Sequence, residues 1–227
     1  PAARHVKLYN SGSFFDRGAI PREDYGAIAG RMGCFERVIV ESHPALVHED
    51  CYAFASLLAG QLEVAMGLET AHPAVLAKLN KKMTLAQYAS AAERLARRGI
   101  DLRSFILVQP PFLRREEALH WACRSIDFAL ECGATAVTLL PTRGGNGAME
   151  ELAQAGEFVA PSLRILEDAL DYGVSLGRER IFADLWEMHR VAHCATCAES
   201  RRLRLARMNL EQVLLPRVGC EVCEARA

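Results

Sequence analysis

Short apolar segments alternate with helical segments along most of this chain of 227 residues, and that alternation limits the folds open to it. The connections between apolar segments are long enough for right-handed crossovers. A parallel sheet covered by helices, in an α/β protein, is therefore the predicted architecture. The expected strands lie at residues 6–9, 37–40, 64–67, 103–108, 136–140 and 180–184.

The helices between these strands are predicted from the residues that begin and end them. Proline or a capping residue begins a helix, as at Thr84, and glycine ends one, as at Gly99 and Gly133. Leu85, Tyr88, Ala92 and Leu95 repeat at helical spacing. The expected helices run from Pro21 to Arg31, Glu49 to Leu58, Pro73 onward, Thr84 to Gly99, Glu116 to Leu130 and Pro161 to Tyr172.

Polar residues follow five of the expected strands. Ligands of parallel α/β proteins bind beyond the carboxyl ends of the strands, so five such ends predict a binding rim. The alternative is that polar residues simply end strands. The five positions are Asn10, Glu41, Glu69, Gln109 and Thr142.

Glu41 and Glu69 follow neighbouring strands and are expected to project into the same mouth. Ionised carboxylates only accept hydrogen bonds, so this pair suits a ribose diol or an ammonium group, which donate them. Solvated carboxylates at strand ends are the alternative. The loop Asn10–Ser13 has small side chains that let a ligand approach the backbone, and the glycine loop at 144–147 indicates a flexible turn more strongly than a phosphate cradle.

Two C-x2-C pairs near the end of the chain predict a metal site. Four thiolates satisfy tetrahedral zinc; an iron–sulfur cluster and no metal remain alternatives. His193 is expected to be a neighbour of the site, and the arginines at 201–207 either face solvent or contact nucleic-acid phosphates. The predicted ligands are Cys194, Cys197, Cys220 and Cys223, whereas Cys34, Cys51, Cys123 and Cys132 are expected to be reduced packing thiols.

The overall charge and hydropathy give no global sign of nucleic-acid or membrane binding, although a local charged patch is compatible with them. A net charge of -1 and a pI near 6.8 give no global footprint for nucleic acid or anionic membrane. No apolar run approaches the roughly 20 residues that span a bilayer. We therefore expect a cytoplasmic location and no membrane partner. His43, His48, His72, His120 and His189 show no metal spacing and are expected to be surface or capping residues.

The stretch from Gly67 to Phe112, GLETAHPAVLAKLNKKMTLAQYASAAERLARRGIDLRSFILVQPPF, resembles the middle of radical S-adenosylmethionine enzymes of the elongator-catalytic-subunit and methylthiotransferase-like group. The upstream segments KLYNSGSFFD and VIVESHP resemble the archaeosine-synthase radical subunit and its bacterial relatives. The resemblance covers about residues 5 to 190. Its matching residues are Gly67, Glu69, Val75, Leu76, Leu79, Asn80, Lys81, Thr84, Gly99 and Ile100.

The resemblance implies a partial (β/α)6 TIM-like barrel whose first strand precedes Pro1. It covers residues 1–191, and residues 192–227 form a small metal-binding segment with four cysteines. Such enzymes hold a [4Fe–4S] cluster through a C-x3-C-x2-C loop, and this sequence contains no such triplet. Either the cluster ligands lie outside the given chain, as an opening at Pro1 favours, or the polypeptide does not cleave S-adenosylmethionine.

The resemblance also assigns residues to S-adenosylmethionine. Asn10 and the loop Ser11, Gly12 and Ser13 would receive the methionine amino group, and Glu41 and Glu69 would lie near the ribose and methionyl moieties. The segment Ile106, Val108 and Gln109 would pack on adenine, although a glycine usual in the family is replaced there.

Two main hypotheses follow from these observations. In the first, the chain is the C-terminal portion of a radical S-adenosylmethionine enzyme that modifies a nucleoside in RNA such as tRNA, with flavodoxin or ferredoxin as reductant and zinc at the terminal cysteines. In the second, a non-catalytic barrel and zinc module bind nucleic acid or a protein partner. A third, a non-radical α/β-barrel enzyme, lacks a recognisable nucleophile or acid–base pair.

Overall fold

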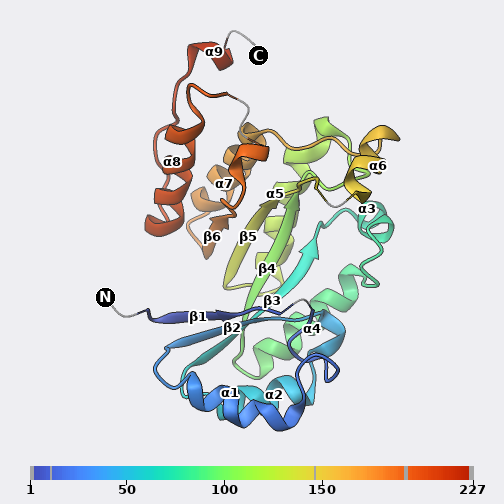
Figure 1. Cartoon of the computed structure of the whole chain (residues 1–227), viewed down its shortest axis with the longest axis vertical. Helices are drawn as coiled ribbons and strands as arrows, with labels where there is room; N and C mark the ends of the chain where they lie inside the picture. Colours follow the sequence, from blue (N-terminus) through green and yellow to red (C-terminus); the bar gives the residue numbers. More distant parts are fainter. Residues whose placement is uncertain (1–2, 11, 146, 192–193, 225–227) are drawn as a thin grey trace.

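A curved sheet of six parallel strands forms the centre of the computed structural model, which describes residues 3–10, 12–145, 147–191 and 194–224 (Figure 1). The strands pair in sequence order from β1 to β6, each parallel to the next. They are β1 (His5–Leu8), β2 (Arg37–Glu41), β3 (Gln61–Glu69), β4 (Asp101–Val108), β5 (Ala136–Pro141) and β6 (Arg180–Ala183).

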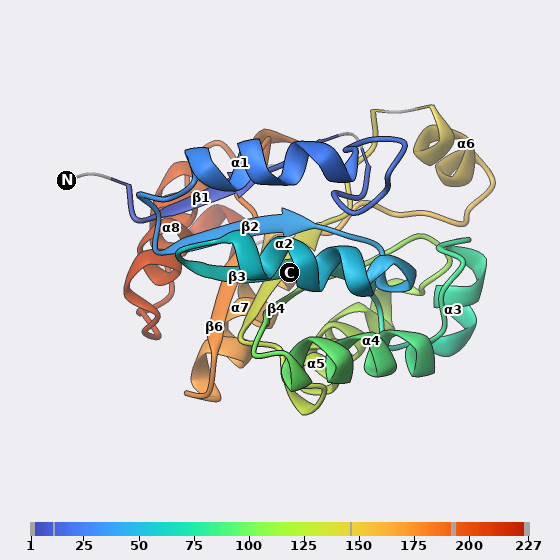
Figure 2. The ribbon, with the colours of Figure 1, turned by 90° about the horizontal axis from the view of Figure 1, so that it is seen from below.

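Helices connect successive strands and cover the outer face of the sheet, as Figure 2 shows from below. The predicted alternation is confirmed, and α6 is a helix that the sequence pattern did not predict. The α-helices are α1 (Tyr25–Arg31), α2 (Glu49–Leu57), α3 (Pro73–Lys78), α4 (Leu85–Arg97), α5 (Ala118–Glu131), α6 (Ala148–Gln154), α7 (Leu163–Ser175), α8 (Ala198–Glu211) and α9 (Glu221–Glu224). Short 3-10 helices lie at η1 (Arg22–Asp24), η2 (Pro44–Leu46), η3 (Arg115–Glu117) and η4 (Met188–Arg190).

The six parallel strands make a half-barrel, which confirms the predicted fold class. All six lie within residues 5–183 of this chain. The strand that the resemblance places before Pro1 would therefore be a seventh strand.

Each strand presents one face to the helices and the other to the concave side of the half-barrel, because side chains alternate along a strand. In β3, Leu62, Val64 and Met66 belong to the hydrophobic core between sheet and helices. Glu63 and Ala65 alternate with them, outside that core cluster although both are buried. The concave face of the barrel is thus polar at its N-terminal end.

Side-chain caps define where several helices begin. Thr84 caps α4, as the sequence predicted, and Gln87 completes a capping box with it. His43, His48 and His72 each accept a hydrogen bond from a backbone N–H in the first turn of η2, α2 and α3. The prediction that these three histidines are capping residues is confirmed.

Helix α8 closes the outer edge of β6 with two side-chain amides. Asn209 accepts from the N–H of Ala183 and donates to its carbonyl, both at 2.8 Å. Gln212 does the same to Ile181, at 2.8 and 3.0 Å. The two amides therefore satisfy backbone groups that a further strand would otherwise pair.

Within the described residues, no helix is both long enough and apolar enough to cross a membrane.

Candidate functional site

The carboxyl ends of β2 and β3 bring Glu41 and Glu69 together at the predicted rim. Glu41 is exposed at the rim, yet the surrounding chain removes enough water from its carboxyl group to raise its pKa, and the carboxylate of Glu69 raises the pKa further. Lys81 lowers it in part. Two like charges facing each other favour a cationic or hydrogen-bond-donating ligand between them.

The local backbone positions Glu69. The pairing between β3 and β4 shifts register between Gly67 and Glu69, and Glu69 adopts a left-handed φ of 65°. Its side chain folds back over Gly67, where a Cβ would overlap Glu69 Oε1, so a larger residue at 67 would displace this carboxylate. Glu69 is 8% exposed, and its Oε1 lies 2.9 Å from Lys81 Nζ. Lys81 thus forms an ion pair with Glu69, and the ammonium group of a ligand could form the same ion pair.

The loop after β1 approaches the same rim and contains unsatisfied polar atoms. Phe14 N–H donates to the carbonyl of Glu41 at 2.8 Å, and His43 N–H donates to Ser13 Oγ at 2.9 Å, so the loop is tied to the end of β2. Both side-chain polar atoms of Asn10 are buried without a hydrogen-bond partner among the described residues. A Cβ at Gly12 would meet open space, and Ser11 lies outside the described residues.

Gln109 ends β4 with the same unusual backbone as Glu69. Its φ is 55°, it is 1% exposed, and its Nε2 donates to the carbonyl of Val159 at 2.7 Å. Its Oε1 is buried and has no partner in the described part of the chain. Buried polar groups without partners cost free energy, so Asn10 and Gln109 both indicate a place where a ligand supplies the missing hydrogen bonds.

Ile106 and Val108, the two other residues assigned to adenine, face the helices, on the side of the sheet opposite the concave face. Ile106 and Val108 are fully buried in the hydrophobic core against the helices. Phe105 and Leu107 alternate with them and are only half-buried. A contact of Ile106 or Val108 with adenine stays a prediction.

Most polar groups in the rest of the rim bond to the chain itself, although Arg143 Nε is buried without a partner among the described residues. Thr142 donates to the carbonyl of Val108 at 3.2 Å, and Arg143 pairs with Asp184 at 2.8 Å. In the glycine loop, Glu150 accepts from the N–H groups of Gly145 and Gly147 at 2.5 and 2.8 Å. The Glu150 carboxylate accepts from the backbone N–H groups that a bound phosphate would need. This agrees with the interpretation of the loop as a turn.

An ion-pair network occupies the other end of the concave face. Fully buried Glu63 accepts from Arg103 at 2.6 Å, Arg180 at 2.8 Å and Arg37 at 2.9 Å. Burial opposes its ionisation, but the charges and hydrogen bonds of Arg103 and Arg180 outweigh burial and lower its pKa. Arg37 also pairs with Asp101. Glu63 was not predicted as a site residue. The pattern that could have indicated it is an acidic residue near the start of one strand, with arginines near the starts of other strands.

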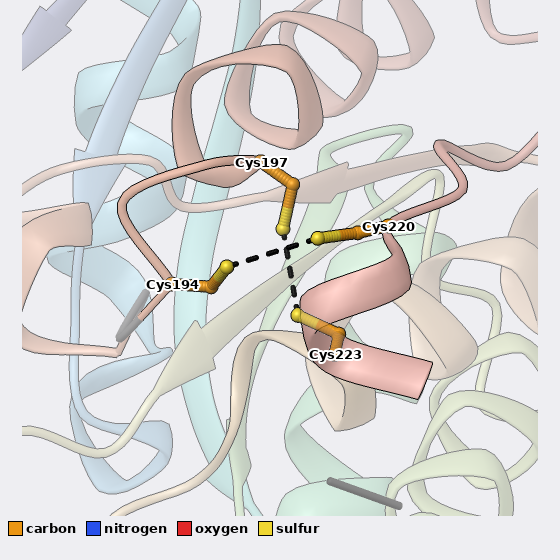
Figure 3. A group of neighbouring side chains, drawn as sticks. All are labelled: Cys194, Cys197, Cys220 and Cys223. Atoms are coloured by element: carbon orange, nitrogen blue, oxygen red, sulfur yellow. Dashed lines mark hydrogen bonds between the residues drawn. The ribbon is translucent and has the colours of Figure 1, made fainter. Parts of the chain in front are cut away.

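The four predicted metal ligands converge at one point, with all four sulfur atoms within 4.8 Å of one another (Figure 3). Cys194 Sγ lies 3.8 Å from Cys220 Sγ, and Cys197 Sγ lies 3.6 Å from Cys223 Sγ. Thiolates about 2.3 Å from one tetrahedral ion would lie about 3.8 Å apart. The backbone N–H of Cys197, the Cys223 thiol and the N–H of Thr196 lower the pKa of Cys194 to about 6. The donor set therefore fits a single metal ion.

The arginines between the two cysteine pairs all meet carboxylates of the same chain. Arg201 pairs with Glu167 at 3.1 Å, and buried Arg204 pairs with Asp171 at 2.7 Å. Arg202 and Arg207 pair with glutamates on α8 itself. These contacts fix α8 to α7 and leave little unpaired charge on this helix for nucleic acid.

Comparison with known proteins finds similarity in fold and in sequence. No protein-family model matches the chain. Its fold is similar to that of Elp3 from Methanocaldococcus infernus, with a TM-score of 0.68 at 11% identity over 93% of this chain and 55% of that one. In sequence it is 30% identical to archaeosine synthase subunit beta of Methanosarcina acetivorans over 165 residues, 70% of this chain and 47% of the relative.

The chain is thus similar in fold to Elp3 and in sequence to a subunit of archaeosine synthase. An uncharacterised protein of Methanocaldococcus jannaschii is 26% identical over 95% of the chain and 63% of its own length. The chain thus spans between about two fifths and two thirds of the length of the curated relatives it matches.

The residues of this chain do not fit the catalytic [4Fe–4S] cluster of the radical enzymes. The sequence holds no C-x3-C-x2-C triplet. Cys51 lies alone in α2, and burial raises the pKa of its thiol to about 12. The four sulfur atoms near the end of the chain are spaced for one ion, whereas a cubane places four irons between its thiolates. No catalytic step through a cluster is derived from this chain.

Proposed function

We propose that this chain supplies the S-adenosylmethionine-binding part of a radical S-adenosylmethionine enzyme. The observation that carries the proposal is the rim, where buried, unpartnered atoms of Asn10 and Gln109 flank the carboxylates of Glu41 and Glu69. S-Adenosylmethionine offers an ammonium group, ribose hydroxyls and adenine nitrogens, which match acceptors and donors of this kind.

In this proposal, each part of the ligand meets a different strand end. The ammonium group takes the place of Lys81 at Glu69, next to the loop of Ser11, Gly12 and Ser13. The ribose hydroxyls donate to Glu41. The adenine lies near Gln109, at the end of β4.

We propose further that the complete enzyme modifies a nucleoside in RNA. The support is the sequence similarity to a protein named as a subunit of archaeosine synthase. Cluster ligands would come from outside residues 1–227, and flavodoxin or ferredoxin would supply the electron. The paired arginines of α8 count against the alternative of a non-catalytic module that binds nucleic acid through this helix.

The test of this activity is anaerobic reconstitution of a polypeptide that contains this chain together with a C-x3-C-x2-C segment. With iron, sulfide, a reductant and S-adenosylmethionine, it should form 5′-deoxyadenosine. The same polypeptide with the triplet changed to alanines is the control. Product no higher than in that control would contradict the proposal.

We also propose that residues 192–227 form a separate metal-bound segment, that its four cysteines hold zinc, and that the ion keeps α8 against β6. The sulfur spacing supports one tetrahedral ion. Elemental analysis of the purified chain should give one zinc per molecule, and Cys194→Ser and Cys220→Ser should lose it. Cys34→Ser, at an exposed cysteine outside the site, should keep it. Unchanged metal content in the first two variants would reject the assignment.

A further inference from the structure

A cavity of about 240 Å³ lies beside the rim, between η2 and the first half of α4. Its wall includes His43, Lys82, Gln87, Ser90 and Arg94. The cavity and the rim are connected through the chain: His43 N–H donates to Ser13 Oγ in the rim loop, and the His43 ring bonds the carbonyl of Lys81, whose ammonium group holds Glu69. The cavity wall and the rim are therefore built from the same chain segments.

The cavity carries positive charge without an acid to neutralise it. No aspartate or glutamate is among its described lining residues. Arg94 donates only to neutral acceptors, namely the carbonyl of Val47 at 3.0 Å, Ser90 Oγ at 3.0 Å and the carbonyl of Pro44 at 3.3 Å. Lys82 makes no ion pair with another described residue. On the exposed face of the same helix, Arg97 does pair with Glu93.

The remaining polar groups of the cavity wall add a neutral donor. Gln87 Oε1 accepts from the N–H of Thr84 at 2.9 Å in the capping box, which leaves its Nε2 to donate elsewhere. His43 adds no free donor, because its Nδ1 accepts from the N–H of Ala45 at 3.1 Å and its Nε2 bonds the carbonyl of Lys81 at 3.0 Å. Two cations and a neutral donor around a small space favour an anion with several oxygen atoms.

The backbone holds Lys82 in an unusual conformation at this place. Lys82 and Asn80 both have left-handed φ values, 51° and 53°, in the short connection between α3 and α4. Residues other than glycine adopt this conformation rarely, and it recurs at ligand sites. The connection also contains Lys81, so one short segment presents neighbouring ammonium groups to the rim and to the cavity.

We infer that this cavity binds a phosphodiester group of the RNA substrate, next to the nucleoside presented at the rim. The inference rests on the proposed function for its choice of RNA as the source of the phosphate. The cavity volume admits a phosphate with part of its sugar, and it is below the range of about 300–1,000 Å³ typical of whole small-molecule sites.

The experiment measures binding of a fluorescein-labelled RNA hairpin to the full chain by anisotropy at several salt concentrations. Lys82→Asn removes the charge and keeps a residue that tolerates left-handed φ. It should weaken binding about tenfold and reduce the slope of log affinity against log salt by about one. Lys82→Arg should restore both values. Arg97→Glu, on the same helix but outside the cavity, is the control and should leave the slope unchanged.

Further measurements separate the possible failures. Ser90→Asp places a carboxylate beside Arg94 and should weaken RNA binding as well, with the thermal midpoint confirming that the variant folds. Inorganic phosphate should compete only weakly; competition as strong as that of unlabelled RNA would overturn the RNA assignment in favour of a free-anion site. Absence of RNA binding, or equal affinity and salt slope in wild type and Lys82→Asn, would overturn the inference. The affinity for S-adenosylmethionine, measured separately, should be the same in Lys82→Asn as in wild type. If wild type does not bind S-adenosylmethionine, that result contradicts the proposed function and not the inference about the cavity.

Discussion

The two ends of the half-barrel use polar residues in opposite ways. At the N-terminal end, Glu63 meets Arg37, Arg103 and Arg180, and each charge has a partner from a different strand. At the C-terminal end, Asn10 and Gln109 keep buried polar atoms that the described chain does not satisfy.

This difference separates stability from binding. A paired network joins β2, β3, β4 and β6, and removal of its central carboxylate leaves arginine charges without that partner. Unpaired buried atoms cost free energy in the free protein and regain it only when a ligand arrives. We therefore expect substitutions at the N-terminal end to affect folding, and substitutions at the rim to affect ligand affinity.

The largest expected effect is on stability, from Glu63→Ala. The change leaves three arginines without their common acceptor, and breaking a buried ion pair in this way costs about 3–5 kcal/mol. Urea denaturation should show it as a lower midpoint at a similar slope. Glu36→Ala, which removes an exposed ion pair with Arg4, is the matched control and should change the midpoint little. Equal effects in the two variants would remove the structural role given to Glu63.

A smaller effect of the opposite sign is expected at the rim. Asn10→Ala removes two polar atoms that have no partner among the described residues, so the free energy of unfolding should stay the same or rise by about 1 kcal/mol. The affinity for S-adenosylmethionine should fall in the same variant. A clear loss of stability would mean that Asn10 already has partners in the free protein, and the distinction between the two ends would fail.

The smallest expected effect is a pH dependence from Glu41. Burial and the nearby Glu69 raise its folded pKa above the unfolded value, so the folded state binds the proton more tightly. Its contribution to stability is greatest below the unfolded pKa and is lost as pH rises through the folded pKa. Glu41→Gln should therefore gain stability over wild type between about pH 4 and neutrality. A difference that is independent of pH, in thermal or urea midpoints, would contradict the raised pKa.

Much of this architecture was predictable because it depends on local patterns. Apolar runs and capping residues such as Thr84 specify elements within a few residues of their sequence. The convergence of Glu41 and Glu69 follows from parallel strands alone, and the C-x2-C spacing predicts the site of four cysteines. Even the histidine caps were among the predicted alternatives.

The features that were missed depend on contacts between distant segments. Glu63 contacts Arg180, which is 117 positions away in the sequence, and the amides of Asn209 and Gln212 meet β6 only after α8 has folded back. The pairing of Lys81 with Glu69 requires the left-handed connection between α3 and α4. No periodicity or spacing in the sequence encodes such contacts, because each depends on the relative placement of two elements.

The most direct test of the difference between the two ends is calorimetric titration of S-adenosylmethionine into wild type, Glu69→Gln and the distant control Glu36→Gln. We predict saturable one-to-one binding to wild type and control, and about tenfold weaker binding to Glu69→Gln, since one charge-assisted hydrogen bond is lost. Thermal midpoints of all three proteins should remain close. Absence of binding to wild type, or the same affinity in wild type and Glu69→Gln, would contradict the account.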